Sequence, residues 1–241
     1  GFAHVSCLAE QAKILVAEAE ERHLDDDQWV RWWTCSLCGQ DYHGVVACAL
    51  GWACWKTYLG RPERNWARDS AMTRLGNGLS EAGHNDDALF VQDTQLATMR
   101  RLSAPEGIIL VIQSNLANTY QSLGRIEESL LLKRDVYSGW LKLHGEEDAN
   151  TFIAANNYAN ALLNLRRFEK AKALLRKSVP TARRVLGEND RLTLKIRKNY
   201  ARAFYEDASA TLDDLHEAVT TLEETTQTAR RVLGGAHPTA E

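Results

Sequence analysis

The sequence predicts an all-α protein, a right-handed superhelix (solenoid) of about four helical hairpins with a small N-terminal partial zinc-finger or helical cap. Three observations predict this fold. Only four prolines occur in 241 residues, apolar residues recur at helical spacing, and the chain beyond residue 70 repeats itself with a period of about 42 residues. Because one hairpin cannot bury its apolar face alone, neighbouring copies must stack to make a core.

The repeats are visible by direct comparison of the chain with itself. Residues 114–135 align with 156–177, so that Asn118 falls on Asn160. Matches upstream and downstream extend the pattern to four copies, with about five extra residues in the fourth copy, expected in the loop around 207–211. The predicted repeats are about 70–110, 111–151, 152–193 and 194–241.

Each copy holds two apolar helical stripes separated by a short polar break, as at 123–125 and 165–167. Small residues recur where the two helices of a hairpin must approach each other, and larger residues fill the space between them. The small positions are Gly76, Ala88, Ala117, Ser129, Ala159, Ala171, Ala201 and Ala218. The large positions are Leu79, Tyr120, Leu162 and Phe204.

The period and the motif NYANAL…RFEKAKALLRK…ARRVLG resemble the tetratricopeptide repeat, in particular that of kinesin light chains. The resemblance covers residues 70–241. It implies a protein–protein interaction scaffold that holds an extended peptide on the concave face, which is formed by the first helix of each hairpin.

On this face the sequence places an asparagine ladder with a basic end. An amide offers a donor and an acceptor together, which suits the backbone of an extended peptide. The basic end favours an acidic side chain or a free carboxylate. The predicted groove residues are Asn77, Ser114, Asn118, Gln121, Asn156, Asn160, Lys195, Lys198 and Arg202. The alternative is that these are solvated residues that mark only the repeat register.

The N-terminal segment offers two zinc hypotheses, both using the Cys35-x2-Cys38 spacing that suits a tight turn. The first is a nucleic-acid-binding zinc knuckle completed by His43 and Cys48. Against it, Tyr42 stands where such a knuckle has glycine, and residues 44–60 read as one apolar helix. Phosphate-binding lysines and arginines are also missing beside it.

The second hypothesis rests on a resemblance. His4-x2-Cys7, a helix, the tryptophans at 29, 32 and 33, and Cys35-x2-Cys38 resemble the second half of a RING-CH finger. Together with the repeats, this resembles a large family of microalgal proteins that carry a RING-CH finger ahead of tetratricopeptide repeats. It implies a finger remnant at 1–43, a capping helix or linker at 44–69 and the repeat array at 70–241.

In that family His4 and Cys7 would complete one zinc site, and Cys35 and Cys38 another. The other half of each site would precede Gly1, since the chain begins without methionine and is expected to be part of a longer protein. Zinc is therefore an open expectation. The four residues form two half-sites, or they gather around one ion. Cys48 and Cys54 are expected to be inert thiols on a core helix.

The chain carries no catalytic motif, so the sequence predicts a binding module and not an enzyme. The alternative is the substrate-recruiting part of a RING-CH-type ubiquitin ligase, which would bind a ubiquitin-conjugating enzyme through a complete finger. A weaker alternative is a zinc-knuckle nucleic-acid binder, which the net charge of −3 does not favour.

The location of the chain is predicted from its apolar runs and its cysteines. The longest apolar run, 44–55, is shorter than the roughly 20 residues that span a membrane. The five cysteines all lie in the first quarter of the chain, and their odd number argues against a framework of disulfide bonds. Both features predict a reducing, cytoplasmic location.

Overall fold

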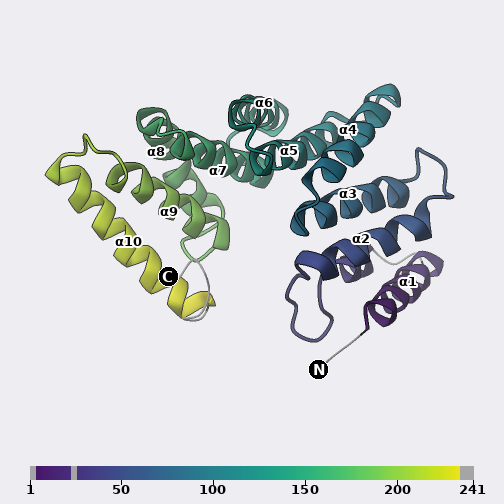
Figure 1. Cartoon of the computed structure of the whole chain (residues 1–241). Helices are drawn as coiled ribbons and strands as arrows, with labels where there is room; N and C mark the ends of the chain where they lie inside the picture. Colours follow the sequence, from purple (N-terminus) through teal and green to yellow (C-terminus); the bar gives the residue numbers. More distant parts are fainter. Residues whose placement is uncertain (1–3, 23–25, 234–241) are drawn as a thin grey trace. The chain divides into compact units, whose positions relative to one another are not determined.

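The computed structural model describes residues 4–22 and 26–233, and within these ranges its regular secondary structure is helical apart from one isolated bridge between Thr34 and Asp41 (Figure 1). The chain divides into two compact units, Gly1–Arg125 and Ile126–Glu241. The predicted fold class, an all-α solenoid of tetratricopeptide-type hairpins, is confirmed. The helices are α1 (Val5–Glu21), the 3-10 helix η1 (Asp26–Trp32), α2 (Gly44–Tyr58), α3 (Trp66–Glu81), α4 (Asn85–Arg101), α5 (Glu106–Ser122), α6 (Ile126–His144), α7 (Ala149–Asn164), α8 (Phe168–Val185), α9 (Arg191–Tyr205) and α10 (Leu212–Leu233).

Local chemistry fixes where the first helix of a hairpin begins. Asn65, Asp148 and Asp190 are the N-cap residues of α3, α7 and α9. Each side chain accepts hydrogen bonds from the two backbone N–H groups that follow the first helical residue, at 2.8–3.4 Å. These bonds satisfy donors that a helix start otherwise leaves unpaired.

The predicted polar breaks are the helix ends. Gly124 has φ 75°, and its N–H and that of Arg125 bond back to the carbonyls of Gln121 and Tyr120 at 3.1 and 2.9 Å. This is the Schellman arrangement, which needs a left-handed residue and therefore favours glycine. The same arrangement recurs one repeat later, where Arg166 takes φ 54°. Residues other than glycine adopt this left-handed backbone conformation only at a cost in free energy.

In the first unit, α2, α3, α4 and α5 pack in sequence, and α3 also contacts α5. α1 packs on α2 and η1. Aromatic rings fill this N-terminal core: the ring centroid of Trp29 lies 5.1 Å from those of Tyr58 and Trp66 and 6.4 Å from that of Trp32. The N-terminal segment thus has its own apolar core.

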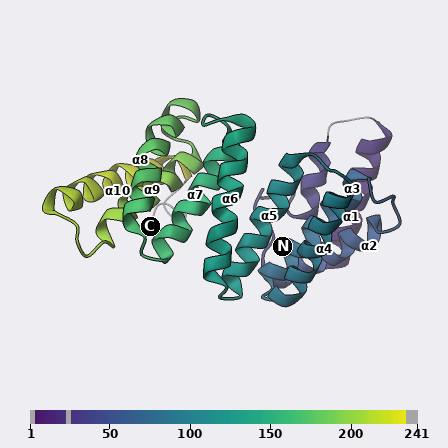
Figure 2. The ribbon, with the colours of Figure 1, turned by 90° about the horizontal axis from the view of Figure 1, so that it is seen from above.

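In the second unit, α7 and α9 contact each other as well as the helices that alternate with them (Figure 2). The predicted small residues Ala159, Ala171 and Ala201 are fully buried. Leu162 and Phe204, two of the predicted large ones, are at most 1% exposed. Small side chains let the helices approach each other, and large side chains fill the remaining space. This core is therefore packed as the sequence predicts.

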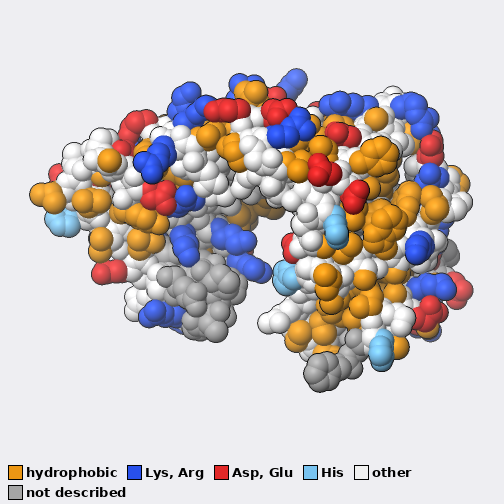
Figure 3. Space-filling model, in the orientation of Figure 1, with side chains coloured by type: hydrophobic (Ala, Val, Ile, Leu, Met, Phe, Trp, Pro, Cys, Tyr) orange, Lys and Arg blue, Asp and Glu red, His pale blue; other side chains and the backbone are white. Residues whose placement is uncertain are grey.

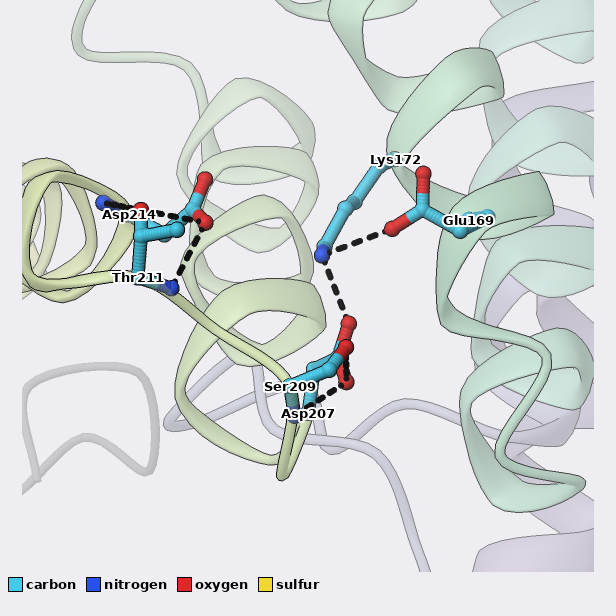
Figure 4. Close-up of polar contacts among 6 residues, drawn as sticks. All are labelled: Glu169, Lys172, Asp207, Ser209, Thr211 and Asp214. Carbon is cyan, nitrogen blue, oxygen red and sulfur yellow. Dashed lines mark hydrogen bonds and ion pairs between the residues drawn. The ribbon is translucent and has the colours of Figure 1, made fainter.

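The extra residues of the fourth copy form the loop between α9 and α10, which a buried ion pair secures (Figure 4). Lys172 Nζ of α8 lies 2.7 Å from Asp207 Oδ2 and 2.9 Å from Glu169 Oε1. The side chains of Lys172 and Asp207 are 6% and 9% exposed. Ser209 donates to Asp207 Oδ1 through both its backbone N–H and its hydroxyl, at 2.9 and 2.7 Å.

Asp207 should make the stability of the protein sensitive to acid. Hydrogen bonds from Lys172 and then Ser209 lower the pKa of Asp207 from 3.8 to about 2. A depressed folded-state pKa adds stability above pH 3.8, and this stability is lost as the pH falls from 3.8 toward 2. We expect Asp207→Asn to lower the free energy of unfolding at pH 6 by about 1–2 kcal/mol.

The measurement is urea unfolding followed by circular dichroism from about pH 6 to about pH 2.5. The difference between wild type and Asp207→Asn should shrink at the acid end. Asp213→Asn, which changes an exposed carboxylate in the first turn of α10, serves as the matched control. A difference for Asp207→Asn that stays constant over this range would contradict the assignment.

Candidate functional site

Two of the predicted groove asparagines, Asn156 and Asn160, lie on α7, and each of them pairs with a side chain of α9. Asn199 Nδ2 donates to Asn156 Oδ1 at 2.9 Å. Neither residue has another side-chain hydrogen bond within the described part of the chain. The pair therefore leaves the Asn156 amide free to donate and the Asn199 carbonyl oxygen free to accept. These are the two groups that a peptide backbone requires.

One turn further along, Arg202 joins the two helices. Its Nη1 donates to Asn160 Oδ1 at 2.9 Å and its Nη2 to Asn164 Oδ1 at 3.1 Å. Its Nε donates to Glu206 Oε1 at 2.7 Å on its own helix. The guanidinium is thus held in place, and Asn160 turns its amide nitrogen away from Arg202.

The α7–α9 face, which we define by Asn156, Asn160, Asn199 and Arg202, carries a positive stripe. Arg191, Lys195, Lys198 and Arg202 follow each other at intervals of three or four residues along α9, and Figure 3 shows Lys and Arg side chains gathered over this helix. Partial burial and then the neighbouring charge of Arg191 lower the pKa of Lys195. These charges give the α7–α9 face a positive electrostatic potential.

The other predicted groove residues lie in the first unit. Ser114, Asn118 and Gln121 are on α5, with Asn118 exposed. Asn77 of α3 lines a cavity of about 160 Å³ together with Trp33, His43 and Arg74. Residues of the N-terminal segment thus form one wall of this cavity.

Arg74 gives this α3 cavity a cation. Its guanidinium lies 4.3 Å from the centroid of the Trp33 ring. Burial lowers the pKa of Arg74. Among the described residues no hydrogen bond or salt bridge to its side chain is found, so its guanidinium N–H groups are available to an acceptor that enters the cavity.

Three residues of these sites are missing from the sequence-based prediction: Arg74, Asn164 and Asn199. The sequence does contain a pattern that could have predicted these residues. Asn164 lies one helical turn after Asn160, and Arg74 aligns with Asn115, Asn157 and Asn199 in the repeat register. The predicted groove residues come from other columns of the repeat, so these positions are not among them.

Cys35 and Cys38 lie together in one tight turn. The backbone N–H groups of Cys38 and Leu37 donate to the Cys35 sulfur, and together with the Cys38 thiol they lower the pKa of Cys35 to about 7. Gly39 follows with φ 67°, and Gln40 accepts from the N–H of Cys35 at 2.8 Å. Such a turn stabilises a thiolate.

The structure does not bring either complete ligand set together. Within residues 4–22 and 26–233, no three His, Cys, Asp or Glu side chains gather as a metal-binding group. His4 and Cys7 are exposed at the start of α1, and His43 faces Glu81 at 3.4 Å. The donors present therefore do not fit a tetrahedral zinc ion.

The remaining cysteines pack in the core. Cys48 packs against the cluster of Leu75, Leu79 and Ala88, and Cys54 is fully buried. Burial raises the pKa of both thiols. As the sequence predicts, these two are packing residues, and Cys48 is therefore not positioned as the fourth ligand of a knuckle.

The fold and the paired helix faces define a helical-repeat protein, and comparison with known proteins identifies the repeats. Residues 108–179 match the tetratricopeptide repeat family. No curated protein matches the chain. In the described part of the chain, none of the helices combines the length and apolar character of a membrane span.

Solved structures share the fold at low identity. BtubC (BKLC) from P. vanneervenii is 16% identical with a TM-score of 0.61, over 95% of this chain and 75% of that one. A Podosopora anserina putative kinesin light chain with nearly identical TPR-like repeats is 16% identical with a TM-score of 0.61, and the match covers 95% of this chain and 98% of that one. A second crystal structure of that protein, with a single substitution, is 16% identical with a TM-score of 0.63, and the match covers 97% of this chain and 99% of that one. The chain is thus structurally similar to kinesin-light-chain-like repeat proteins.

Proposed function

We propose that the protein is an interaction scaffold that binds an extended, acidic peptide of a partner protein along the α7–α9 face. The pairing of Asn156 with Asn199 is the observation that carries this proposal. It leaves one amide donor and one carbonyl acceptor on neighbouring helices, and these can bind the N–H and C=O of one peptide unit. Tetratricopeptide repeats, which present a continuous face of first helices, support the same role.

The charges on this face determine which peptide side chains are preferred. Lys195, Lys198 and Arg202 repel cations and attract carboxylates. We infer that acidic side chains or a free C-terminal carboxylate give specificity, while the amides hold the backbone.

Removing the amides should weaken peptide binding without unfolding the protein. We expect the double variant Asn156→Ala/Asn160→Ala to bind an aspartate-rich peptide about 30-fold more weakly, because two net hydrogen bonds of about 1 kcal/mol each are lost. Both side chains are half-buried and outside the apolar core, so the helical circular dichroism spectrum should stay unchanged.

The measurement is fluorescence anisotropy with two labelled peptides that share their apolar residues and differ only in carrying aspartates or lysines. The aspartate peptide should bind more tightly, and its affinity should fall with added salt. Asn189→Ala, whose side chain accepts from Arg231 in the second unit, is the matched control and should bind as wild type does. Equal affinity of the double variant and wild type would reject the α7–α9 face as the site.

The ubiquitin-ligase and nucleic-acid hypotheses stay predictions of the sequence. The Cys35–Cys38 turn is compatible with the first of them, because a half-site of this shape can be completed by ligands from outside this chain.

A further inference from the structure

A second surface lies in the first unit, on α2, α3 and α4. The walls of this α2–α4 groove are aromatic: Trp52 and Trp55 of α2 and Phe90 of α4. Its volume is about 390 Å³, which is within the range of cavities that hold a ligand or a large side chain. Figure 3 shows hydrophobic side chains gathered over these helices.

The aromatic rings of the groove are unusually accessible. Phe90 is 74% exposed and Trp52 is 43% exposed. Contiguous exposed apolar surface of this kind is typical of an interaction site. The groove shares no residue with the α7–α9 face or with the α3 cavity, so its function is a separate question.

The floor of the groove is fixed. Leu75 and Leu79 of α3 form it and are each 3% exposed. α2 and α3 are held in close backbone contact, because a Cβ atom on Gly51 would lie 2.8 Å from the carbonyl oxygen of Arg74. A groove with a rigid floor does not have to be ordered when a ligand binds, which lowers the cost of binding.

One carboxylate lies at the edge of this apolar surface. Asp87, in the first turn of α4, lines the groove, and its side chain has no hydrogen bond or ion pair with any described residue. Its charge contributes, after burial, to the raised pKa of Cys48, which packs against the Leu75, Leu79 and Ala88 cluster. Arg68 has its guanidinium carbon 5.9 Å from the Trp55 ring centroid, and it donates to the Arg61 carbonyl at 2.8 Å.

We propose that the α2–α4 groove binds a segment of a partner protein that presents a large apolar side chain next to a lysine or arginine. The apolar side chain would lie between Trp52 and Phe90 and over Leu75 and Leu79. The adjacent cation would face Asp87 and the aromatic rings, where both the carboxylate and the ring faces attract it. Because the carboxylate is unpaired beside apolar surface, an anionic partner is disfavoured.

The test uses the full chain and short rhodamine-labelled peptides with the cores Lys-Leu-Phe-Lys, Glu-Leu-Phe-Glu and Lys-Ser-Ser-Lys. We expect the first core to bind most tightly in fluorescence anisotropy. Asp87→Asn should weaken it by about fivefold and Trp52→Ala by more than about tenfold. Asp93→Asn, an exposed carboxylate of α4 that does not line the groove, is the matched control and should have no effect.

Asp87→Asn is nearly isosteric and at the surface, so it keeps the test valid even if Trp52→Ala lowers stability. The Asn156→Ala/Asn160→Ala variant should retain this binding, which separates the groove from the proposed peptide site. Equal binding of the glutamate core, absence of binding by all cores, or an equal effect of Asp87→Asn and Asp93→Asn would overturn the proposal. So would a dimer in sedimentation velocity that Trp52→Ala dissociates, since the occupant would then be a second copy of the chain.

Discussion

Replacing Phe204 with alanine is expected to lower the free energy of unfolding of the second unit by about 4 kcal/mol, the largest effect that we predict. Phe204 is fully buried and belongs to the cluster with Ala201 and Ala218. Its ring packs edge-on against Tyr200, with centroids 5.0 Å apart. Alanine would leave a cavity between α9 and α10, because the helices around it are joined by short loops and relax only in part.

The charged residues near the Phe204 ring add to this cost. Lys172 Nζ lies 5.0 Å and the Arg176 guanidinium 5.6 Å from the ring centroid. The Lys172–Asp207 ion pair is next to the ring and would become accessible to water. The loop between α9 and α10 should therefore loosen together with the core.

Urea unfolding followed by circular dichroism measures this effect. Tyr205→Ala, at the next residue of α9 and 49% exposed, is the matched control and should cost less than about 1 kcal/mol. A loss of less than about 2 kcal/mol for Phe204→Ala would mean that the core collapses around the cavity. Since α9 also carries Asn199 and Arg202, Phe204→Ala should weaken the proposed binding of the aspartate peptide as well, although Phe204 itself is fully buried.

The repeat period was sufficient to predict most of the fold. Residues that recur every 41 or 42 positions, such as Ala117 and Ala159, keep the same environment in each copy. The helix ends were predictable too, because caps and Schellman turns depend on a few neighbouring residues. The N-terminal core around Trp29 and Tyr58 has no repeat, and its packing depends on contacts between segments distant in sequence.

The candidate site was predictable only in part. The sequence places Asn156, Asn160 and Arg202 on one face, because helical periodicity fixes which residues share a side. It does not show that Arg202 binds two asparagines of the neighbouring helix, since this depends on the distance and rotation between α7 and α9. The Cys-x2-Cys spacing likewise predicts the turn at Cys35 and Cys38. It does not show whether other metal-ligating side chains lie close to that turn.

The second large effect concerns Gly78, which sets the distance between α2 and α3. We expect Gly78→Ala to lower the free energy of unfolding by about 3 kcal/mol. A Cβ atom at this position would lie 2.6 Å from the carbonyl oxygen of Ala47 and 2.9 Å from Cys48 Cα. Both are backbone atoms, so the two helices must move apart. Alanine has the higher helix propensity by about 1 kcal/mol, and this gain offsets only part of the loss.

Gly76→Ala is the matched control, because this glycine lies in the same helix and gains the same propensity. Its Cβ atom would meet the Gln92 side chain at 3.1 Å, and a side chain can adjust more easily than a backbone. Urea unfolding should therefore show a small change for Gly76→Ala and a large one for Gly78→Ala. Equal effects would contradict the backbone-contact argument.

The consequence of Gly78→Ala for function follows from the position of this glycine between two surfaces. Gly78 lines the α3 cavity beside Arg74 and Asn77, and the neighbouring Leu79 forms part of the floor of the α2–α4 groove. Separation of α2 from α3 should widen both, so peptides with the Lys-Leu-Phe-Lys core should bind Gly78→Ala more weakly than Gly76→Ala. Unchanged affinity in Gly78→Ala would show that the spacing of α2 and α3 does not shape the groove.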